Sequence, residues 1–324
     1  METTTMTPPP QDLIKALKDS INQSIIGQQA VVDQLIIALL AEGHVLIQGL
    51  PGLAKTRAVS AMASSVDAQL RRIQFTPDML PSDITGSEMF NSESQQLSFT
   101  RGPVFSNFVL ADEINRAPAK VQSALLEAMA EAQVSVAGQS YPLPDLFMVL
   151  ATQNPVEQEG TYPLPEAQMD RFLMQLLIDY PSIESEILML QMLRAESRAE
   201  AGQPVISMAD ILQARRQIEA IHVSAAVDQY IVALVDASRK PQKYHQQLSK
   251  WIDQGASPRA SIALDKAARA TAWLAGRDFV NTDDVRRVIH PVLRHRISRS
   301  YTAIGNNISS DHIIDTIVDH VAWV

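Results

Sequence analysis

The sequence predicts an α/β protein in two parts: a parallel sheet flanked by helices, followed by a smaller all-helical domain. Three observations support this prediction. Apolar strands alternate with amphipathic helices up to about residue 180, a Gly/Pro-rich loop ending in Lys-Thr joins a strand to a helix, and the remainder is helical without a strand candidate. We therefore expect a disordered lead-in over residues 1–10, a core over residues 11–180 and a helical domain over residues 181–324.

The composition excludes several classes of protein. The chain has 324 residues, of which 46% are hydrophobic and 19% charged, which suits two globular domains. It contains no cysteine, which excludes disulfides, thiolate metal sites and cysteine nucleophiles. A net charge of −9 argues against nucleic acid as a partner. No apolar run approaches the roughly 20 residues of a transmembrane segment, and the Thr/Pro-rich start lacks the features of a signal peptide, so we expect a cytoplasmic protein.

Residues 45–56 carry the clearest chemical signal. A short apolar strand is followed by a loop that ends where a helix begins. Such a loop presents backbone N–H groups and a helix N-terminus to an anion, which predicts a phosphate site. The residues expected to bind the nucleotide there are Gly49, Leu50, Pro51, Gly52, Leu53, Ala54, Lys55, Thr56 and Arg57.

Each position in this loop has an expected role. Lys55 would reach the β- and γ-phosphates, and the Thr56 hydroxyl would bind Mg²⁺. Gly49 and Gly52 would let the backbone approach phosphate closely. Ala54 stands where the usual pattern has glycine, and it is tolerable because an L-residue fits without strain where a helix begins. The alternative interpretation is an ordinary βα turn with a solvated lysine.

Two helices are predicted before this loop, over residues 11–20 and 30–40. The turn between them contains Ile26 and Gly27. An apolar turn placed just before a phosphate loop would contact an adenine ring. Plain core packing is an equally good interpretation of the same residues.

A long polar segment follows a second strand, which we expect at residues 71–75. Residues 76–86 are rich in turn formers, and residues 95–99 could form one arm of a small hairpin. So long an irregular stretch inside an α/β domain tends to be functional. We interpret it as a functional insertion near residues 85–100.

Asp112 and Glu113 form the second chemical signal, at the end of an apolar strand. The carboxyl ends of parallel strands are where ligands bind. Asp112 would hold Mg²⁺ through its water shell, and Glu113 would orient and deprotonate the attacking water. The alternative is a pair of acids that merely favours the start of the next helix.

Further polar residues follow along the core. Residues 134–143 read as a hairpin with a three-residue loop, and an apolar strand at residues 147–152 leads to Asn154. The Asn154 amide could bind the γ-phosphate or the water, or could simply form a turn before proline. Arg171 beside Asp170 is either a surface ion pair or a positive charge supplied to a neighbouring subunit's phosphates.

The second half of the chain reads as helices begun by capping residues. Ser182, Ser207 with Asp210, Ser224, and Ser257 before Pro258 are expected helix starts. A further helix should begin at residues 282–284 and end before Pro291, and the last helix should cover residues 309–321.

Arginines stand out in this half. Arg259 lies in the first turn of its helix, where a cation opposes the helix dipole unless an anion such as a nucleotide phosphate between the two domains is near. A second group is expected to form a solvated or intersubunit face: Arg286, Arg287, Arg294, His295, Arg296 and Arg299.

Several segments together resemble the MoxR family of AAA+ ATPases, in the clade with an insertion in helix 2. They are GLPGLAKT at residues 49–56, RGPV at 101–104, LADEINRAP at 110–118, ATQNP at 151–155, LPEAQMDRF at 164–172 and GASPRA at 255–260. The resemblance covers roughly residues 11–300. It implies a P-loop AAA+ core with a parallel sheet, followed by an all-α lid.

The resemblance also implies roles for single residues. Lys55 and Thr56 would serve phosphate and Mg²⁺, and Asp112 and Glu113 metal and water. Asn154 matches the sensor-1 position, Arg259 the sensor-2 position and Arg171 the arginine finger. Residues 85–100 match the helix-2 insert, and residues 134–143 match the pre-sensor hairpin.

The expected function is an Mg-ATP-dependent ATPase that forms hexameric rings and remodels protein partners in the manner of a chaperone. Family members commonly work with a partner that carries a von Willebrand factor A domain. The alternatives are a magnesium-chelatase-like motor subunit, a nucleic-acid-associated AAA+ motor and an ATP-gated scaffold. The acidic charge disfavours nucleic acid, and the intact Asp112–Glu113 pair disfavours the scaffold.

Overall fold

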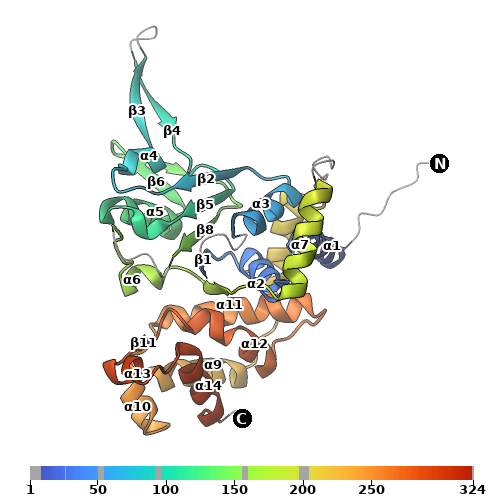
Figure 1. Cartoon of the computed structure of the whole chain (residues 1–324), viewed down its shortest axis with the longest axis vertical. Helices are drawn as coiled ribbons and strands as arrows, with labels where there is room; N and C mark the ends of the chain where they lie inside the picture. The colour runs from blue at the N-terminus through green and yellow to red at the C-terminus, as the bar shows by residue number, and fades with distance from the viewer. Residues whose placement is uncertain are drawn as a thin grey trace, which may run out of the picture.

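A five-stranded parallel sheet forms the centre of the molecule (Figure 1). The structure is a computed structural model that describes residues 9–25, 27–49, 55–91, 96–154, 160–196 and 204–322. The strand order is β2-β5-β8-β1-β9, with bounds β2 (Leu70–Gln74), β5 (Phe108–Asp112), β8 (Met148–Gln153), β1 (Val45–Gly49) and β9 (Met174–Ile178). The central strands are almost wholly buried apolar runs, as parallel strands covered on both faces require.

Helices cover the sheet on both faces and complete the core. They are α1 (Pro10–Ser24), α2 (Gln29–Leu40), α3 (Lys55–Ser65), α4 (Pro81–Thr85), the 3₁₀ helix η1 (Ile114–Arg116), α5 (Ala119–Glu131) and α6 (Glu166–Met169). The predicted helices on either side of the phosphate loop are confirmed by α1, α2 and α3. The short helix α4 lies in a stretch that the sequence presented only as turn formers, because a five-residue helix is too short to show a helical period.

Two antiparallel hairpins extend from the core. The first pairs β3 (Gly86–Asn91) with β4 (Gln96–Arg101), and the second pairs β6 (Gln133–Val136) with β7 (Gln139–Pro142). The first projects well beyond the sheet (Figure 1). Its β3 arm was missed from the sequence because its side chains are mostly exposed and lack alternation.

The second hairpin corrects a prediction about its loop. The loop holds two residues, Ala137 and Gly138, and not three. Both have positive φ, 50° and 80°, as a type I′ turn requires of its two central residues. The twist of the flanking strands favours this turn. Asn-Gly is a strong sequence signal for a type I′ turn, whereas Ala-Gly is not.

The remaining helices follow the sheet. They are α7 (Ile183–Glu196), α8 (Met208–Glu219), α9 (Ala225–Arg239), the 3₁₀ helix η2 (Pro241–Lys243), α10 (Leu248–Trp251), α11 (Pro258–Leu274), α12 (Thr282–Leu293), α13 (Tyr301–Gly305) and α14 (Ser310–His320). The predicted helix starts at Ser207 with Asp210, Ser224 and Ser257 are confirmed as caps, and the predicted last helix is α14, which Ser309 caps. The α/β core followed by a helical lid is therefore confirmed.

Three predictions for the lid are wrong in detail. A two-stranded sheet pairs β10 (Ile252–Gln254) with β11 (Ser298–Arg299), although no strand was expected here. Strands this short carry no readable alternation, and only the tertiary fold brings them together. The cap of α12 is Asn281, one residue earlier than predicted. Its side chain accepts a hydrogen bond from the Asp284 N–H.

Helix α12 also continues through Pro291 to Leu293, where the sequence predicted an earlier end. Proline removes one backbone hydrogen bond and disfavours a helix interior. Here Val288, Val292 and Leu293 are buried, and α12 packs against β9. Burial of this apolar face holds the last turn helical despite the proline.

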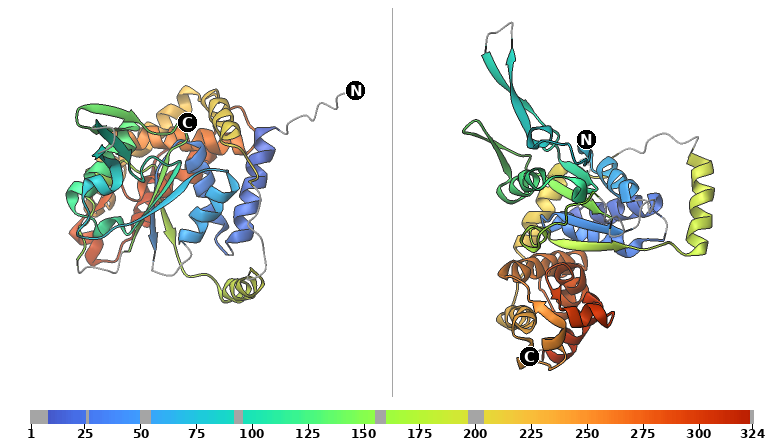
Figure 2. Two further views of the ribbon diagram at one scale, coloured as in Figure 1. Left: turned by 90° about the horizontal axis from the view of Figure 1, so that it is seen from above. Right: turned by 60° about the vertical axis from the view of Figure 1, so that its left-hand side comes forward.

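Helix α7 stands apart from the sheet (Figure 2). Its apolar side chains Ile183, Ile187 and Leu190 are exposed. Among the residues that the structure describes, none of the helices combines the length and apolarity that crossing a bilayer requires.

Candidate nucleotide site

Three of the strands that carry predicted site residues end at the carboxyl edge of the sheet. Strand β1 ends at Gly49, β5 at Asp112 and β8 at Gln153, and the three strands are adjacent and parallel. Helix α3 begins at Lys55, and the residues between it and the end of β1 are those predicted to form the phosphate loop. The side chains of Lys55 and Thr56 are outside the described structure, as are Ile26, Leu50, Pro51, Gly52, Leu53 and Ala54.

Gly49 has a structural reason to be glycine besides its expected closeness to phosphate. A Cβ at this position would lie 2.7 Å from the carbonyl oxygen of Ile178 on β9. Contacts this short are essentially never made by real Cβ atoms, so a side chain would push β1 and β9 apart. The end of β1, where the phosphate loop starts, is set by this close approach.

Arg57 contacts the end of α1, just before the predicted turn that contains Ile26 and Gly27. The Arg57 Nε donates to the backbone oxygen of Ser24 at 2.8 Å, at the end of α1. Gly27 follows with φ of 81°, and a Cβ there would collide with Ser185 on α7. Arg57 therefore contacts the last residue of α1, two residues before the predicted turn, and the roles of Arg57 and Gly27 toward a nucleotide stay predictions.

Asp112 is held in place by two neighbouring strands. Its Oδ1 accepts from the Thr152 hydroxyl on β8 at 2.6 Å. Its Oδ2 accepts from Arg72 on β2, from Nε at 3.1 Å and from Nη2 at 2.5 Å. The carboxylate is mostly buried, with 14% of its side chain exposed. Its orientation is therefore fixed before any ligand arrives.

Glu113 leaves the strand in the left-handed region, with φ of 57°. Its backbone N–H donates to the Thr152 hydroxyl at 2.9 Å, so this one hydroxyl joins Glu113 to Asp112. Its carboxylate accepts from Gln74 Nε2 on β2 and from Arg116 Nη1, both at 2.9 Å. A non-glycine residue in this conformation persists only where its surroundings hold it, which is common at functional sites.

Sequence reasoning missed four residues that orient these carboxylates: Arg72, Gln74, Arg116 and Thr152. The signal was available in part, because Gln74 and Thr152 stand at or near the ends of their strands. Strand order decides which strand ends become neighbours, and the sequence does not state that order. Asn154 follows β8 at the same edge and is buried, with 5% exposed.

The donor set at this edge suits Mg²⁺. Mg²⁺ is usually bound through one or two carboxylates, with water and phosphate oxygens completing its octahedron. Asp112 offers such a carboxylate, and Thr56 is the second residue of the helix α3. Among the described residues, no group of three or more His, Asp or Glu side chains could form an all-protein metal site.

Arg171 lies at the opposite, amino edge of the sheet. It precedes β9, and the Leu173 N–H donates to the carbonyl of His44, just before β1. Strands β1 and β9 run parallel over five paired residues, which span about 16 Å. The Arg171 Nη1 donates to the Leu126 carbonyl at 3.0 Å. Arg171 is therefore about one strand length from the phosphate loop of its own chain.

Asp170 and Arg171 do not form the surface ion pair that was one interpretation of the sequence. Asp170 pairs with Arg296 of the lid, Nε to Oδ1 at 2.8 Å, and not with its neighbour Arg171. Arg296 also donates to the carbonyls of Leu173 and Phe172. Burial lowers the pKa of the Arg296 guanidinium, and Asp170 opposes this by stabilising the charge.

The predicted basic face of the lid is not a single face. Arg296 and His295 are buried against the core, with 8% and 7% exposed. Arg294 donates to both carboxylate oxygens of Asp311, at 2.7 and 2.8 Å. Three of the six residues therefore hold the lid together or attach it to the core. The sequence could not show this, because arginines that pair in a fold look like arginines that face water.

Arg259 is also at the amino edge. Ser257 caps α11 by accepting from the Arg259 N–H, and its hydroxyl donates to Asp170 Oδ2 at 2.7 Å. The Arg259 side chain is exposed. The expected phosphate between the two domains of one chain does not fit this position, because the phosphate loop lies at the carboxyl edge.

Comparison with known proteins shows the family to which the chain is similar. Residues 44–174 match the ATPase family associated with various cellular activities (AAA), and residues 249–317 match the AAA lid domain. The first match runs from just before β1 to the start of β9, and the second runs from α10 into α14, the C-terminal part of the helical lid.

Individual relatives cover nearly the whole chain. Chaperone MoxR1 of Mycobacterium tuberculosis is 44% identical over 93% of this chain and 80% of its own length. Protein MoxR of Paracoccus denitrificans is 33% identical over 86% of each chain. A crystal structure of a Cytophaga hutchinsonii protein considered an ATPase superposes with a TM-score of 0.90 at 44% identity, covering 97% of this chain and 96% of that one.

Proposed function

Because the chain belongs to the MoxR family of AAA+ ATPases, we propose that it hydrolyses Mg-ATP at interfaces between the subunits of a ring. The energy released would remodel or activate a protein partner. The name of the relative Chaperone MoxR1 supports a chaperone-like role. A hexameric ring and a partner with a von Willebrand factor A domain are part of the same proposal, carried by the family resemblance.

One observation supports an active site that is shared between two subunits. Asp112 and Glu113 lie at the carboxyl edge of the sheet, whereas Arg171 and Arg259 lie at the amino edge. A single chain cannot bring both sets to one phosphate. A head-to-tail contact, in which the amino edge of one subunit faces the carboxyl edge of the next, brings them together. Such heterologous contacts close into rings when the rotation allows it.

The residues of one subunit would prepare the reaction. Lys55 and the loop amides would hold the phosphates. Bound Mg²⁺ would neutralise charge on the phosphate oxygens. Glu113 would accept a proton from the attacking water and orient it, and Asn154 would hold the water or the γ-phosphate. Thr152 links Glu113 to Asp112, so both carboxylates keep a common position.

The next subunit would supply the positive charge. Arg171 would approach the γ-phosphate as charge develops on it, a contribution of about 10³–10⁵ in rate where arginine fingers are known. Arg259 is exposed at the N-terminus of α11, and both residues are anchored beside Asp170. A phosphate of the neighbouring subunit is an anion that would offset the unfavourable place of Arg259 at a helix N-terminus.

A complementation assay tests the shared site. Arg171→Ala keeps its own acids and Glu113→Gln keeps its own arginine, so each variant alone should be nearly inactive. In a mixture, some interfaces combine an intact Glu113 with an intact Arg171. We expect ATP turnover to reappear on mixing and to rise with total protein concentration.

Lys243→Ala, which changes an exposed lid cation away from either edge, is the control and should turn over ATP like the wild type. If the mixture is as inactive as each variant alone while the wild type is active, the proposal of a site shared between subunits is wrong. If wild type itself shows no hydrolysis at any concentration, the ATPase role of this chain on its own fails.

A further inference from the structure

Helix α7 presents a row of large apolar side chains to water. Ile183, Ile187 and Leu190 are each at least half exposed. They follow one another at intervals of four and three residues, so they lie along one side of the helix. We call these three side chains the apolar stripe of α7. A contiguous exposed apolar surface of this kind is typical of a contact with another protein.

Helix α7 contacts its own core on the side opposite to this stripe. Of the α7 side chains that the structure describes, Ser185 and Met189 are half-buried and the others are exposed. Ser185 packs against Gly27, where a Cβ would collide with it. Gly27 belongs to the predicted nucleotide turn, and α7 begins five residues after the end of β9 at Ile178. The stripe therefore lies at the carboxyl edge of the sheet and faces away from the core.

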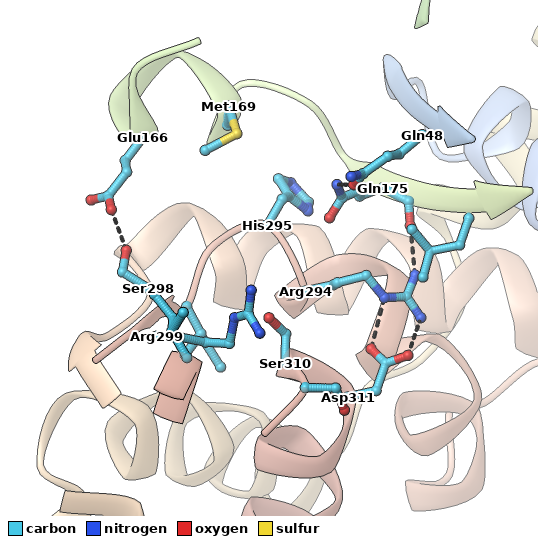
Figure 3. A pocket seen from close by; sticks show the side chains of 14 residues that line it. Gln48, Glu166, Met169, Gln175, Arg294, His295, Ser298, Arg299, Ser310 and Asp311 are labelled. Carbon is cyan, nitrogen blue, oxygen red and sulfur yellow. Dashed lines mark hydrogen bonds and ion pairs between the residues drawn. The ribbon is translucent and has the colours of Figure 1, made fainter. Parts of the chain in front are cut away.

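The lid of the same chain is fixed elsewhere on the core. Figure 3 shows part of this junction, where Arg294 pairs with Asp311 and donates to the Gln175 carbonyl of β9 at 2.9 Å. At the same junction Ser298 donates to the Glu166 carboxylate. Helix α7 stands outside this junction, away from both the core and the lid (Figure 2). The surface that suits the stripe therefore has to come from another molecule.

Helix α11 presents a complementary face on the other side of the molecule. Its exposed side carries Arg259, Ile262 and Lys266, which succeed one another at intervals of three and four residues. Ile262 is 59% exposed. The helix begins beside α6, because its cap Ser257 donates to Asp170. Helices α6 and α7 lie on opposite sides of the sheet (Figure 1), so the start of α11 and the stripe belong to opposite faces of one chain.

The two helix faces also match in charge. Glu184 and Glu186 are exposed and flank the stripe in the first turn of α7. On α11 the apolar Ile262 lies between two cations, close to the positive end of the helix dipole. An apolar surface flanked by acids thus meets an apolar surface flanked by bases, which favours their association and fixes its orientation.

The proposed shared site brings these two faces together. Ile262 lies one turn beyond Arg259, about 4.5 Å further along the helix axis. When Arg259 of one subunit approaches the phosphates of the next, it approaches the subunit edge at which α7 begins. The same movement brings Ile262 to α7 of that next subunit.

We propose that the apolar stripe of α7 docks on the exposed face of α11 of the neighbouring subunit in a head-to-tail assembly. The stripe packs on Ile262, and Glu184 and Glu186 lie beside Lys266 and the N-terminus of α11. The docking rests on the shared active site proposed above, and it identifies a helix that holds neighbouring subunits together.

Sedimentation velocity of the full chain with a non-hydrolysable ATP analogue tests whether α7 supports assembly. We expect Ile187→Glu to weaken self-association at least tenfold, because it places a carboxylate in the apolar contact. Val232→Glu makes the same kind of change at an exposed apolar residue of α9 and should assemble like the wild type. Equal assembly of Ile187→Glu and wild type, or a wild type that stays monomeric at every concentration, overturns the proposal.

A crosslink tests where α7 docks, because the chain has no cysteine of its own. One chain carries Ile187→Cys and a second, tagged chain carries Ile262→Cys, and a short bis-maleimide is added to the mixture. We expect a product that joins the two chains, and none when Val232→Cys replaces Ile262→Cys. Absence of the joined product overturns docking on α11. A product from Ile187→Cys alone shows a symmetric contact between two α7 helices and overturns it as well.

Neither measurement depends on hydrolysis, so the docking and the shared active site can fail separately. If ATP turnover returns on mixing Arg171→Ala with Glu113→Gln while the crosslink does not form, the shared site stands and the docking of α7 is wrong. If the crosslink forms and turnover does not return, α7 docks as proposed and the shared active site is wrong.

Discussion

The two edges of the central sheet carry opposite chemistry. At the carboxyl edge, Asp112 and Glu113 are held by side chains of the neighbouring strands β2 and β8 and of the following turn. At the amino edge, Arg171 and Asp170 lie where the lid is attached, through Arg296 and Ser257. The acids are therefore positioned by groups of the core alone, whereas Asp170, beside Arg171, and the Ser257 cap of the Arg259 helix lie where the lid docks on the core.

The two halves of the proposed active site should therefore respond differently to mutation. Damage at the carboxyl edge should change chemistry and leave stability nearly intact. Damage at the amino edge should loosen the lid as well as the arginines. The following changes separate the two, from the largest expected effect to the smallest.

Glu113→Gln should lower ATP turnover by about 10²–10⁴, the usual contribution of a positioned general base. Nucleotide affinity should stay within a few-fold, because the amide is the same size and the phosphate contacts are made elsewhere. Turnover is measured by phosphate release, and affinity by titration with a fluorescent ATP analogue. Turnover within a few-fold of wild type would show that Glu113 is not the base.

Asp170→Ala should cost about 3–5 kcal/mol of unfolding free energy, because it leaves the Arg296 charge buried without a partner. Urea unfolding measures the loss. Asp236→Asn is the matched control, since its pair with Lys240 is more exposed and is worth at most about 1 kcal/mol. If both variants lose the same small amount, the lid does not depend on the Asp170–Arg296 pair.

Acid should destabilise the amino edge through His44. Its Nδ1 accepts from the Val149 N–H at 3.0 Å, and burial lowers the pKa of His44 to about 4. Between this value and the usual pKa near 6.5 the unfolded chain binds more protons than the folded one. Stability is therefore lost as pH falls through this window, by roughly 3 kcal/mol in all. The depressed pKa of His295 adds a loss of the same sign.

The measurement is urea unfolding at several pH values between 7 and 4 for wild type and His44→Asn. The asparagine Oδ1 can accept from the same Val149 N–H, but it does not titrate. We expect the variant to be less stable at pH 7 and to have a flatter pH dependence. If the unfolding free energies of the two proteins depended equally on pH, His44 would be excluded as the source of the acid destabilisation.

Thr152→Val should lower turnover by about tenfold, because it removes the hydroxyl that joins the Glu113 N–H to the Asp112 carboxylate. One or two kcal/mol is about the worth of hydrogen bonds of this kind. Thr152→Ser keeps the hydroxyl and should retain most of the activity. The two variants compared in the same phosphate-release assay isolate the hydroxyl, and equal activities would mean that the link is dispensable.

Several features could be predicted from residues alone. The end of β1 before Lys55 and the end of β5 at Asp112 and Glu113 were readable, because an apolar run stops at polar residues of defined chemistry. The caps at Ser207, Ser224 and Ser257 were readable for the same local reason. The roles of the loop residues between Gly49 and Lys55 stay predictions.

Other features depend on pairing between distant residues. The sequence gives no order of strands, so it could not show that Thr152 and Gln74 contact the acids. Pro291 suggested a helix end that packing against the core overrides. The β10–β11 pair and the first arm of the long hairpin carry too little periodicity to be read.

By itself the sequence determined the fold class and predicted the phosphate loop and the catalytic acids, because each follows from local patterns of burial and charge. Only the tertiary structure decided that Arg171 and Arg259 lie across the sheet from those acids. The physical reason is that parallel strands place all their carboxyl ends on one edge, while Arg296 and Ser257 attach the lid at the other. The type of a side chain sets the chemistry it can perform, and the direction of its strand sets which other residues it can contact.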